Sequence, residues 1–368
     1  MGSRTSYRRS VMDKRWQKIA HRIIQGLGVQ PGELIDVRDS SGCLDVLLET
    51  SLAIEEVGAT PLLQLLPADY LERLWTEVPL NYLTQWDQSR QEWMKQIDRV
   101  LVLAGTSPDL SLVPKDRFEA WQQAHYRLNV IEEMRRLPYL LAAIPTERGA
   151  QQLGLAKEKL DELLLPALGA SVEELQYEIG RILNKASTSQ AITIHSGDNQ
   201  VLHLEHGDRI WLSDDGCIDE MDQKRGAIVS NLPAGSVYTT VIEEKTEGSL
   251  WLPKAGEARE VVFYFTAGRI VDIEAASGAD LLIKELDSYT GEPRRVGHIG
   301  LGLNPYLDSP TGWTIVDEHI HGYLFISLGE NRYMGGQNES SLNVDYALAG
   351  ATLNVDGQII VSEGKVIV

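Results

Sequence analysis

The first half of the chain alternates between helical and extended hydrophobic patterns. Apolar residues at 12–27 and 43–57 recur at helical spacing. Continuous apolar runs at 99–105 and 139–146 are typical of strands that are buried on both faces of a parallel sheet, and shorter runs at 29–37 and 61–66 also indicate strands. This alternation predicts a doubly wound α/β domain with a mostly parallel sheet.

The pattern changes after residue 190, where short strands and tight turns replace the long helices. Gly-Asp, Ala-Gly or Asp-Gly pairs separate apolar runs within residues 203–212, 263–273 and 353–361, as in β-hairpins. We therefore expect a β-rich α+β C-terminal domain that carries the site. The predicted divisions are a disordered leader at 1–11, the α/β domain at 12–187 and the β-rich site domain at 188–368.

Charge and cysteine content narrow the possible functions. The 368 residues include 34 basic and 53 acidic side chains, a net charge of −19, which disfavours binding to nucleic acid or to an anionic membrane. No apolar run approaches the roughly 18–20 residues that span a bilayer. Cys43 and Cys217 lack metal-binding spacing, so we expect two reduced thiols and a cytoplasmic protein.

Histidines outside the last quarter do not point to a site. His125 lies beside the apolar face of a helical segment, so a structural or surface role is expected. His203 and His206 alternate with charged residues on a predicted hairpin and are expected to be solvated. The chain also lacks the phosphate-loop, HExxH and GxSxG motifs, so none of those three chemistries is indicated.

The last quarter combines Gly-rich turns, short strands and metal-binding side chains. Its segments are HIGLGLNP (298–305), DEHIHGYLFISLG (317–329) and GGQNESSLNVDY (335–346). Asn343 and Asp345 are two residues apart on a predicted strand, so both side chains share one face. With His298 they could converge on one site at the strand ends.

These segments, together with NLPAGSVYTTV (231–241), resemble the thermophilic metallo-aminopeptidases of the aminopeptidase S and T types. The corresponding segments of that family read roughly NxPxGEVFTAP, ELGIGTNP, DEKxxGTxHxALG and GGxNxSxxHxD. All four blocks occur here in the same order. VQPGELIDV (29–37) and ALAGATLNVDG (347–357) also fit, so the resemblance covers nearly the whole chain and implies the family fold.

The resemblance implies an altered metal site. Ser236 and His298 stand where the family has two glutamates, Phe325 and Asn343 stand where it has two histidines, and Asp345 is kept. A two-ion site places its ions about 3.5–4 Å apart between carboxylate and imidazole ligands, and this set cannot supply them. His298, Asn343 and Asp345 could still hold one divalent ion of zinc, cobalt or iron, with a metal-free chain as the alternative.

Further residues near these segments are candidates for supporting roles. Tyr333 lies one residue out of register with the catalytic tyrosine of the family, and Tyr333 or Glu339 could act as a base or a hydrogen-bond donor. His319 and His321 would share one face if they lay on a strand. They are predicted to be either metal ligands or polar walls of the cavity.

Three functions are compatible with these residues. The first is a divergent family member that acts on or binds a peptide or amino-acid-like molecule with at most one metal ion. The second is a non-catalytic peptide-binding protein or partner protein. The third is a mononuclear iron oxygenase similar to the 2,5-dihydroxypyridine dioxygenases, which resemble this family in fold. The family resemblance also implies a homodimer.

Overall fold

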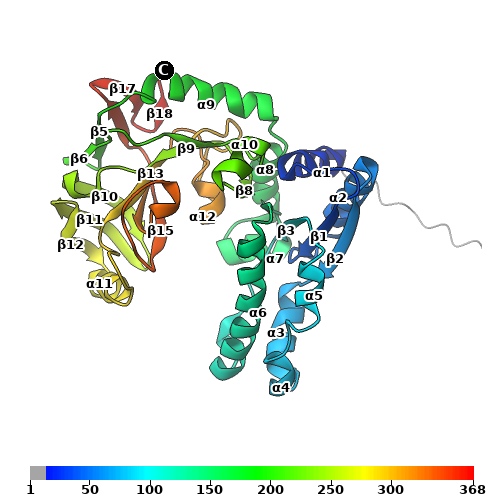
Figure 1. Cartoon of the computed structure of the whole chain (residues 1–368). Coiled ribbons are helices and arrows are strands. Elements are labelled where there is room, and N and C mark those ends of the chain that lie inside the picture. Colours follow the sequence, from blue (N-terminus) through cyan, green and yellow to red (C-terminus); the bar gives the residue numbers. More distant parts are fainter. Residues whose placement is uncertain (1–13) are drawn as a thin grey trace, which may run out of the picture. The chain divides into compact units, whose positions relative to one another are not determined.

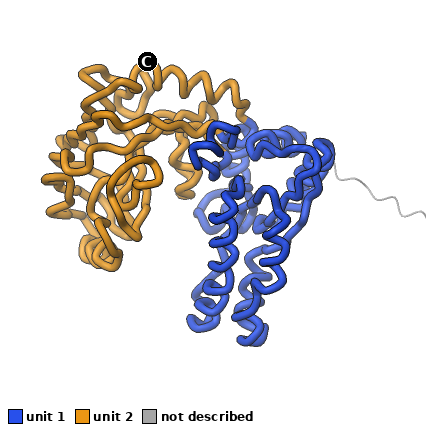
Figure 2. Tube along the Cα trace, viewed as in Figure 1, with its two compact units in different colours: residues 1–169, 216–232 blue, residues 170–215, 233–368 orange. Residues whose placement is uncertain are grey.

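A computed structural model describes residues 14–368, which form two compact units (Figures 1 and 2). Unit 1 contains residues 14–169 and 216–232, and unit 2 contains residues 170–215 and 233–368. The predicted leader at 1–11 lies outside the described residues. This division differs from the predicted boundary between residues 187 and 188.

Unit 1 is built on a five-stranded parallel sheet with the strand order β2-β1-β3-β4-β8. The four apolar runs of the N-terminal half form its first four strands, as predicted, and a short later segment adds the fifth. The strands are β1 (Leu34–Asp39), β2 (Thr60–Leu65), β3 (Arg99–Ala104), β4 (Tyr139–Ala143) and β8 (Val229–Leu232). The predicted combination of helices with a parallel sheet is therefore confirmed for this unit.

Helices connect the strands of this sheet. Helix α1 buries Ile19, Ile23 and Leu27 at the predicted helical spacing, and α2 ends at Gly58 in the left-handed conformation. The helices of unit 1 are α1 (Lys14–Leu27), α2 (Leu44–Val57), α3 (Ala68–Glu77), α4 (Leu80–Leu83), α5 (Arg90–Met94), the 3₁₀ helix η1 (Leu110–Leu112), α6 (Lys115–Arg135), α7 (Glu147–Leu153), α8 (Lys157–Leu168) and α10 (Glu220–Arg225).

Unit 2 contains two antiparallel sheets, in agreement with the predicted β-rich domain. The eight-stranded sheet has the order β12-β11-β10-β6-β5-β16-β17-β18. Its strands are β5 (Ala191–Ser196), β6 (Gln200–Glu205), β10 (Glu247–Ala255), β11 (Ala258–Thr266), β12 (Arg269–Ser277), β16 (Thr352–Val355), β17 (Gln358–Ser362) and β18 (Lys365–Val366). The hairpins predicted from residues 263–273 and 353–361 are β11–β12 and β16–β17.

The second sheet of unit 2 has five strands in the order β15-β14-β13-β9-β7. Its strands are β7 (Leu212–Asp214), β9 (Ser236–Thr239), β13 (Val296–Gly302), β14 (Leu324–Gly329) and β15 (Asn343–Leu348). The helices of unit 2 are α9 (Val172–Ala186), α11 (Ala279–Asp287), α12 (Thr314–Asp317) and the 3₁₀ helices η2 (Glu243–Lys245) and η3 (Arg332–Met334).

Helix α9 explains why the unit boundary precedes the predicted one. Its N-terminus is closed by a capping box between Ser171 and Glu174. Its buried face belongs to unit 2, where Arg181 donates a hydrogen bond to the carbonyl of Val368. The Ser/Thr-rich stretch at 185–190 is therefore the end of this helix and the turn into β5, both inside unit 2.

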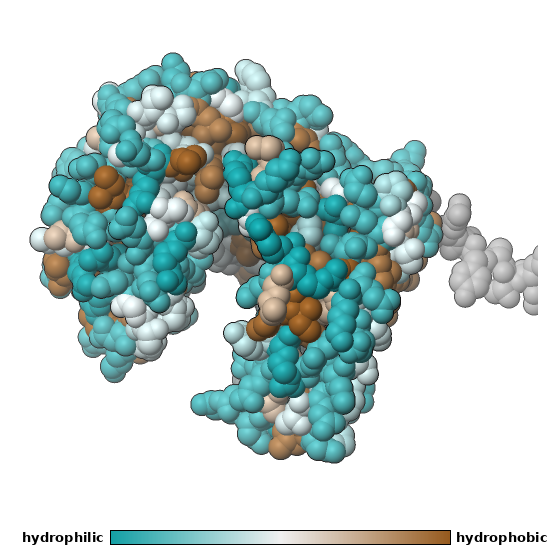
Figure 3. All heavy atoms as spheres, in the orientation of Figure 1, coloured by the Kyte–Doolittle hydropathy of each residue, from teal (hydrophilic) through white to brown (hydrophobic). Residues whose placement is uncertain are grey.

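Much of the visible surface is hydrophilic, with hydrophobic residues in separate patches (Figure 3). None of the helices within residues 14–368 is both long and apolar enough to cross a bilayer. Neither Cys43 nor Cys217 is part of a disulfide bond.

An aromatic cluster in unit 1 includes His125 of helix α6. The imidazole of His125 stacks on Trp121, with ring centroids 4.9 Å apart, and lies 5.7 Å from the ring of Trp86. Its Nδ1 atom is buried without a hydrogen-bond partner. Burial, reinforced by the guanidinium groups of Arg38 and Arg90, lowers the pKa of His125 to about 4. His125 is thus structural, as the sequence indicated.

This lowered pKa predicts a pH-dependent stability. Between pH 6.5 and about 4, the unfolded chain binds a proton at His125 that the folded chain does not, so stability falls as the pH falls. Replacing the ring by His125→Phe should remove this dependence. Urea unfolding at pH 7 and pH 4.5 should show the native chain losing on the order of 2–3 kcal/mol more than the variant. Equal losses would contradict a neutral, buried His125.

Candidate functional site

Strand register brings the predicted site residues onto one face of the five-stranded sheet of unit 2. Gly300 is paired with Phe325 on one side and with Tyr238 on the other, and Ser327 is paired with Asp345. Side chains two residues apart on a strand share a face. The positions on this face are Asp214, Ser236, Tyr238, His298, Gly300, Phe325, Ser327, Asn343 and Asp345.

Two of the predicted residues, His298 on β13 and Asp345 on β15, form a close pair, and Asn343 lies on the same face with other partners. His298 Nε2 lies 3.0 Å from Asp345 Oδ1, and the His298 side chain is buried. Asn343 Oδ1 accepts a hydrogen bond of 3.1 Å from Ser327 Oγ, and Asn343 Nδ2 donates to the hydroxyl of Tyr333 at 3.3 Å. The structure thus brings His298, Asn343, Asp345 and Tyr333 to one end of this face.

The ring of Phe325 covers the middle of the face. A Cβ atom at Gly300 would overlap the Phe325 ring, so the ring lies directly over the Gly300 backbone. The same ring makes an edge contact with His298, with centroids 5.9 Å apart and planes at 81°. Phe325 is 4% exposed. An apolar side chain therefore fills the position where the sequence resemblance places an imidazole ligand.

Ser236 on β9 lies between Gly302 on β13 and Asp214 on β7. Ser236 is paired with Gly302 on β13 and with Asp214 on β7, and it is buried. The Asp214 carboxylate lies 3.9 Å from His319 Nε2, and the Glu318 carboxylate lies 3.4 Å from it. Sequence analysis did not identify either carboxylate as a site residue. Glu318 lies in the DEHIHGYLFISLG segment but was not singled out, and Asp214 reaches this face only through the β7–β9 pairing.

His319 and His321 do not form the strand pair that the HxH spacing suggested. Both lie in the turn between α12 and β14, and their rings have different partners. His319 is 1% exposed and neither ring nitrogen has a hydrogen-bond partner, whereas His321 lies 3.8 Å from the Glu178 carboxylate on α9. Burial lowers the pKa of His319, with Asp214 opposing that effect. His319 is therefore a buried polar residue beside the face that carries the site.

Tyr333 and Glu339 occupy different environments. Tyr333, on η3, is 64% exposed and reaches Asn343 through its hydroxyl. The Glu339 side chain is 74% exposed, and its carboxylate pairs with Arg332 at 3.1 Å. Of these two, only Tyr333 forms a hydrogen bond with a predicted metal ligand, and that ligand is Asn343.

A buried carboxylate holds the Gly335–Gly336 turn. Glu243 accepts hydrogen bonds from Asn331 Nδ2 at 2.9 Å and from the Gln337 amide at 2.7 Å, and pairs with Arg209 at 2.9 Å. The Asn331 carboxamide lies where a Cβ at Gly336 would be. Glycine is required there because any side chain would displace this network. A buried hydrogen-bond network therefore fixes the backbone of the GGxN segment.

One histidine outside the site was predicted incorrectly. His203 is exposed as expected, but His206 is buried, with Nε2 2.9 Å from Thr239 Oγ1 and Nδ1 2.8 Å from the Ser189 carbonyl. Burial lowers its pKa. The reason is tertiary: residues that follow α9 and residues of β9 enclose the imidazole and satisfy both nitrogens.

Two of the predicted metal ligands lie close together on this face. The 3.0 Å between His298 Nε2 and Asp345 Oδ1 is compatible with both atoms binding one ion through bonds of about 2.0–2.2 Å. The other ring nitrogen, His298 Nδ1, is buried without a hydrogen-bond partner. Ser236 and Phe325 offer a neutral hydroxyl and an apolar ring in place of a second set of ligands. Within residues 14–368, no group of three or more His, Cys, Asp or Glu side chains is arranged to hold a metal ion.

Comparisons with known proteins agree with the sequence resemblance. The family model described as thermophilic metalloprotease (M29) matches residues 12–367. The structure of wild-type AmpT from Thermus thermophilus is similar, with a TM-score of 0.73 and 18% identity over 96% of this chain and 99% of that chain. The 2,5-dihydroxypyridine dioxygenase from Pseudomonas putida KT2440 has a TM-score of 0.62 and 15% identity, covering 96% of each chain. At these identities the two structures show the fold alone. The comparison with curated proteins found no match.

The contact between Phe325 and Gly300 makes a specific prediction about packing. Gly300→Ala should lower the free energy of unfolding by about 1–3 kcal/mol, because the added methyl group displaces the ring. The cost should shrink in a Phe325→Ala background, giving a coupling energy of about 1 kcal/mol or more in urea unfolding.

Gly180→Ala is the matched control for this pair. Gly180 lies within helix α9 and no atom lies within 4 Å of a Cβ built there, so alanine should leave stability unchanged or raise it by up to about 1 kcal/mol. Strictly additive effects of the Gly300 and Phe325 substitutions would show that the ring does not depend on the absence of a side chain at Gly300.

Proposed function

Because the chain belongs to the M29 family of thermophilic metalloproteases, we propose that it is a divergent member whose site holds at most one divalent ion. It acts on or binds a peptide or an amino-acid-like molecule. The observation that carries this proposal is the Phe325 ring, which lies over Gly300 and against His298 where a second ion would need a ligand.

In this proposal His298 and Asp345 hold the ion, with Asn343 beside them. A bound divalent ion would supply Lewis acidity towards a carbonyl group and would lower the pKa of a bound water. Asp345 contributes the only charged ligand of the three, and His298 is held in place by the ring of Phe325 and by burial. The Tyr333 hydroxyl accepts a hydrogen bond from Asn343 and can donate one to a bound molecule. The exposed Glu339, which pairs with Arg332, is the more distant candidate for a base.

Two alternatives remain as outcomes of the test. A non-catalytic peptide-binding protein is favoured by the Asn343 carboxamide, whose oxygen and nitrogen are both engaged by protein partners. A mononuclear iron oxygenase is the other alternative, and only the shared fold supports it. The cytoplasm is the proposed location, because Cys43 and Cys217 are not joined in a disulfide bond.

The metal content of the purified protein distinguishes the three proposed functions. Protein purified without chelator should carry no more than one ion per chain by elemental analysis, and Asp345→Ala should remove it while the circular dichroism spectrum stays unchanged. Asp198→Ala, in an exposed turn between β5 and β6, is the control and should keep the metal. Leucine-anilide cleavage should be very slow even with added zinc or cobalt.

Each other outcome has a defined meaning. Two ions per chain together with rapid, chelator-sensitive cleavage would refute the single-ion proposal. Absence of metal in the native chain would favour the non-catalytic protein. Iron with substrate-dependent oxygen uptake would favour the oxygenase.

A homodimer is proposed from the family resemblance. Light scattering at micromolar concentration should therefore report about twice the mass of one chain. A monomer at that concentration would remove this part of the proposal without affecting the metal site.

A further inference from the structure

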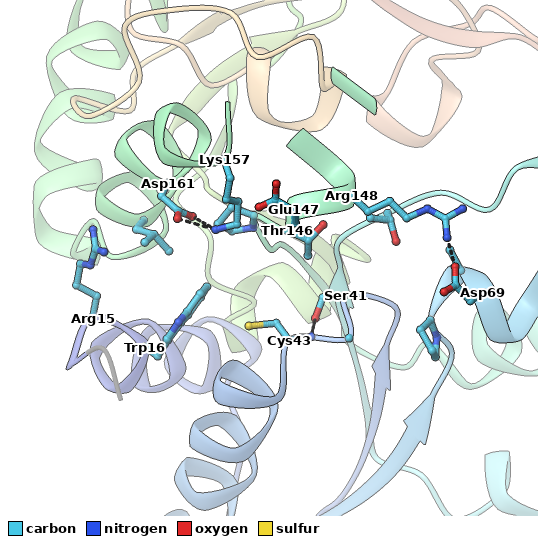
Figure 4. Close-up of a pocket in the computed structure, with 16 residues that line it drawn as sticks. Arg15, Trp16, Ser41, Cys43, Asp69, Thr146, Glu147, Arg148, Lys157 and Asp161 are labelled. Carbon is cyan, nitrogen blue, oxygen red and sulfur yellow. Dashed lines mark hydrogen bonds and ion pairs between the residues drawn. The ribbon is translucent and has the colours of Figure 1, made fainter. Parts of the chain in front are cut away.

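The carboxyl ends of the parallel strands in unit 1 surround a cavity of about 450 Å³ (Figure 4). Residues that follow four of the five strands line it: Ser41, Gly42 and Cys43 after β1, Pro67 to Asp69 after β2, Thr106 after β3, and Pro145 to Arg148 after β4. Helix α1 adds Arg15 and Trp16, and helix α8 adds Lys157, Asp161 and Leu165. The volume lies within the roughly 300–1,000 Å³ of small-molecule sites.

The cavity coincides with the place where a parallel sheet most often binds ligands. Strand β1 is paired with β2 on one side and with β3 on the other. The order of the strands along the sheet therefore reverses between β1 and β3. The loops that follow β1 and β3 therefore diverge and leave a crevice at the carboxyl ends of the strands. The backbone topology alone predicts a binding site here, independently of the residues that line it.

The loops at this crevice are fixed by their own contacts. The Asp39 carboxylate, at the end of β1, accepts hydrogen bonds from Ser41 N at 2.9 Å, Ser41 Oγ at 2.6 Å and Gly42 N at 3.2 Å. A Cβ at Gly105 would lie 2.5 Å from Ser41 Cα and 2.7 Å from Thr146 Cγ2. The loop after β3 therefore packs directly between the other two. A preformed wall of this kind lowers the ordering cost of binding.

The charges that line the cavity are balanced. Three cationic side chains (Arg15, Arg148, Lys157) accompany three carboxylates (Asp69, Glu147, Asp161). Lys157 pairs with Asp161 at 2.5 Å, and Arg148 pairs with Asp69 and, at 2.5 Å, with Glu72. In Figure 4 the Lys157–Asp161 pair and the Arg148–Asp69 pair lie at opposite ends, with Ser41, Cys43, Thr146 and Glu147 between them.

Glu147 distinguishes between the possible ligands. Within residues 14–368 it forms no ion pair, so its carboxylate can receive an ammonium group. A nucleotide or another multiply charged anion would find no net positive charge in this cavity, because the three carboxylates offset the three cationic side chains. A ligand with one positively charged and one negatively charged group would find side chains of opposite charge for both groups in this cavity.

We propose that unit 1 binds a small zwitterion, an amino acid or a dipeptide, in this cavity. The ammonium group of the ligand lies towards Glu147, and its carboxylate lies towards Lys157. This proposal does not depend on metal in unit 2. It gives the chain a second, separate place for a molecule of the class proposed above.

Calorimetric titration of the full chain with L-alanyl-L-alanine, in the presence of chelator, tests the proposal. The dipeptide should bind saturably, and either N-acetylation or C-terminal amidation of the probe should weaken binding about tenfold, since each removes one charged contact. Glu147→Gln and Lys157→Met should weaken binding of the unmodified dipeptide by a similar factor. Glu147 is exposed, so its substitution should not disturb folding.

Matched controls locate the binding. Lys115 and Glu119 form a comparable ion pair four residues apart on α6 and do not line the cavity, so Lys115→Met and Glu119→Gln should leave the affinity unchanged. Asp345→Ala changes the site proposed in unit 2, so it tests which of the two sites holds the dipeptide. Loss of binding in Asp345→Ala but not in Glu147→Gln would assign the dipeptide to unit 2 and overturn the cavity proposal. Absence of dipeptide binding, or preferential binding of phosphate or AMP, would overturn it as well.

Discussion

The register of one antiparallel sheet sets the chemistry of unit 2. Neighbouring strands lie about 4.8 Å apart, so side chains on paired positions must either contact one another or leave room. Gly300 leaves room between Tyr238 and Phe325, and the phenyl ring occupies that room. Phe325, which stands where the family resemblance places a metal ligand, is therefore part of the packing of the sheet. His298 contacts the same ring, so its orientation also depends on this packing.

Many residues of the segments that resemble the family are required by the conformation and close packing of the backbone. Gly302 lies against the carbonyl of Ile320, and Gly336 lies against the Asn331 carboxamide. Glu243 and Arg209 satisfy the buried polar groups beneath that turn. These requirements are steric and do not involve a metal. The turns can therefore persist while the side chains that would bind ions are replaced.

Unit 1 shows how a fold places polar groups without a recognisable motif. Each parallel strand delivers its following loop to the same edge of the sheet, and the helices that start there bring charged side chains with them. The residues around the cavity extend from Arg15 to Leu165 in sequence and belong to no single motif. The cavity and its balanced charge exist only because the strands are adjacent.

The sequence alone determined the features that depend on local periodicity. Apolar runs identified the parallel strands, Gly-containing turns identified two hairpins of unit 2, and a spacing of two residues placed Asn343 and Asp345 on one face. The segment resemblance identified the family.

Tertiary structure decided which segments lie next to one another and what is buried. Pairing of β7 with β9 brought Asp214 beside Ser236, enclosure by Ser189 and Thr239 buried His206, and the packing of α9 placed residues 170–186 in unit 2. The turn before β14 separated the rings of His319 and His321. Periodicity describes how a side chain is directed along its own strand or helix. It carries no information on which distant segment will cover that side chain, and that contact decides burial, charge and the composition of a site.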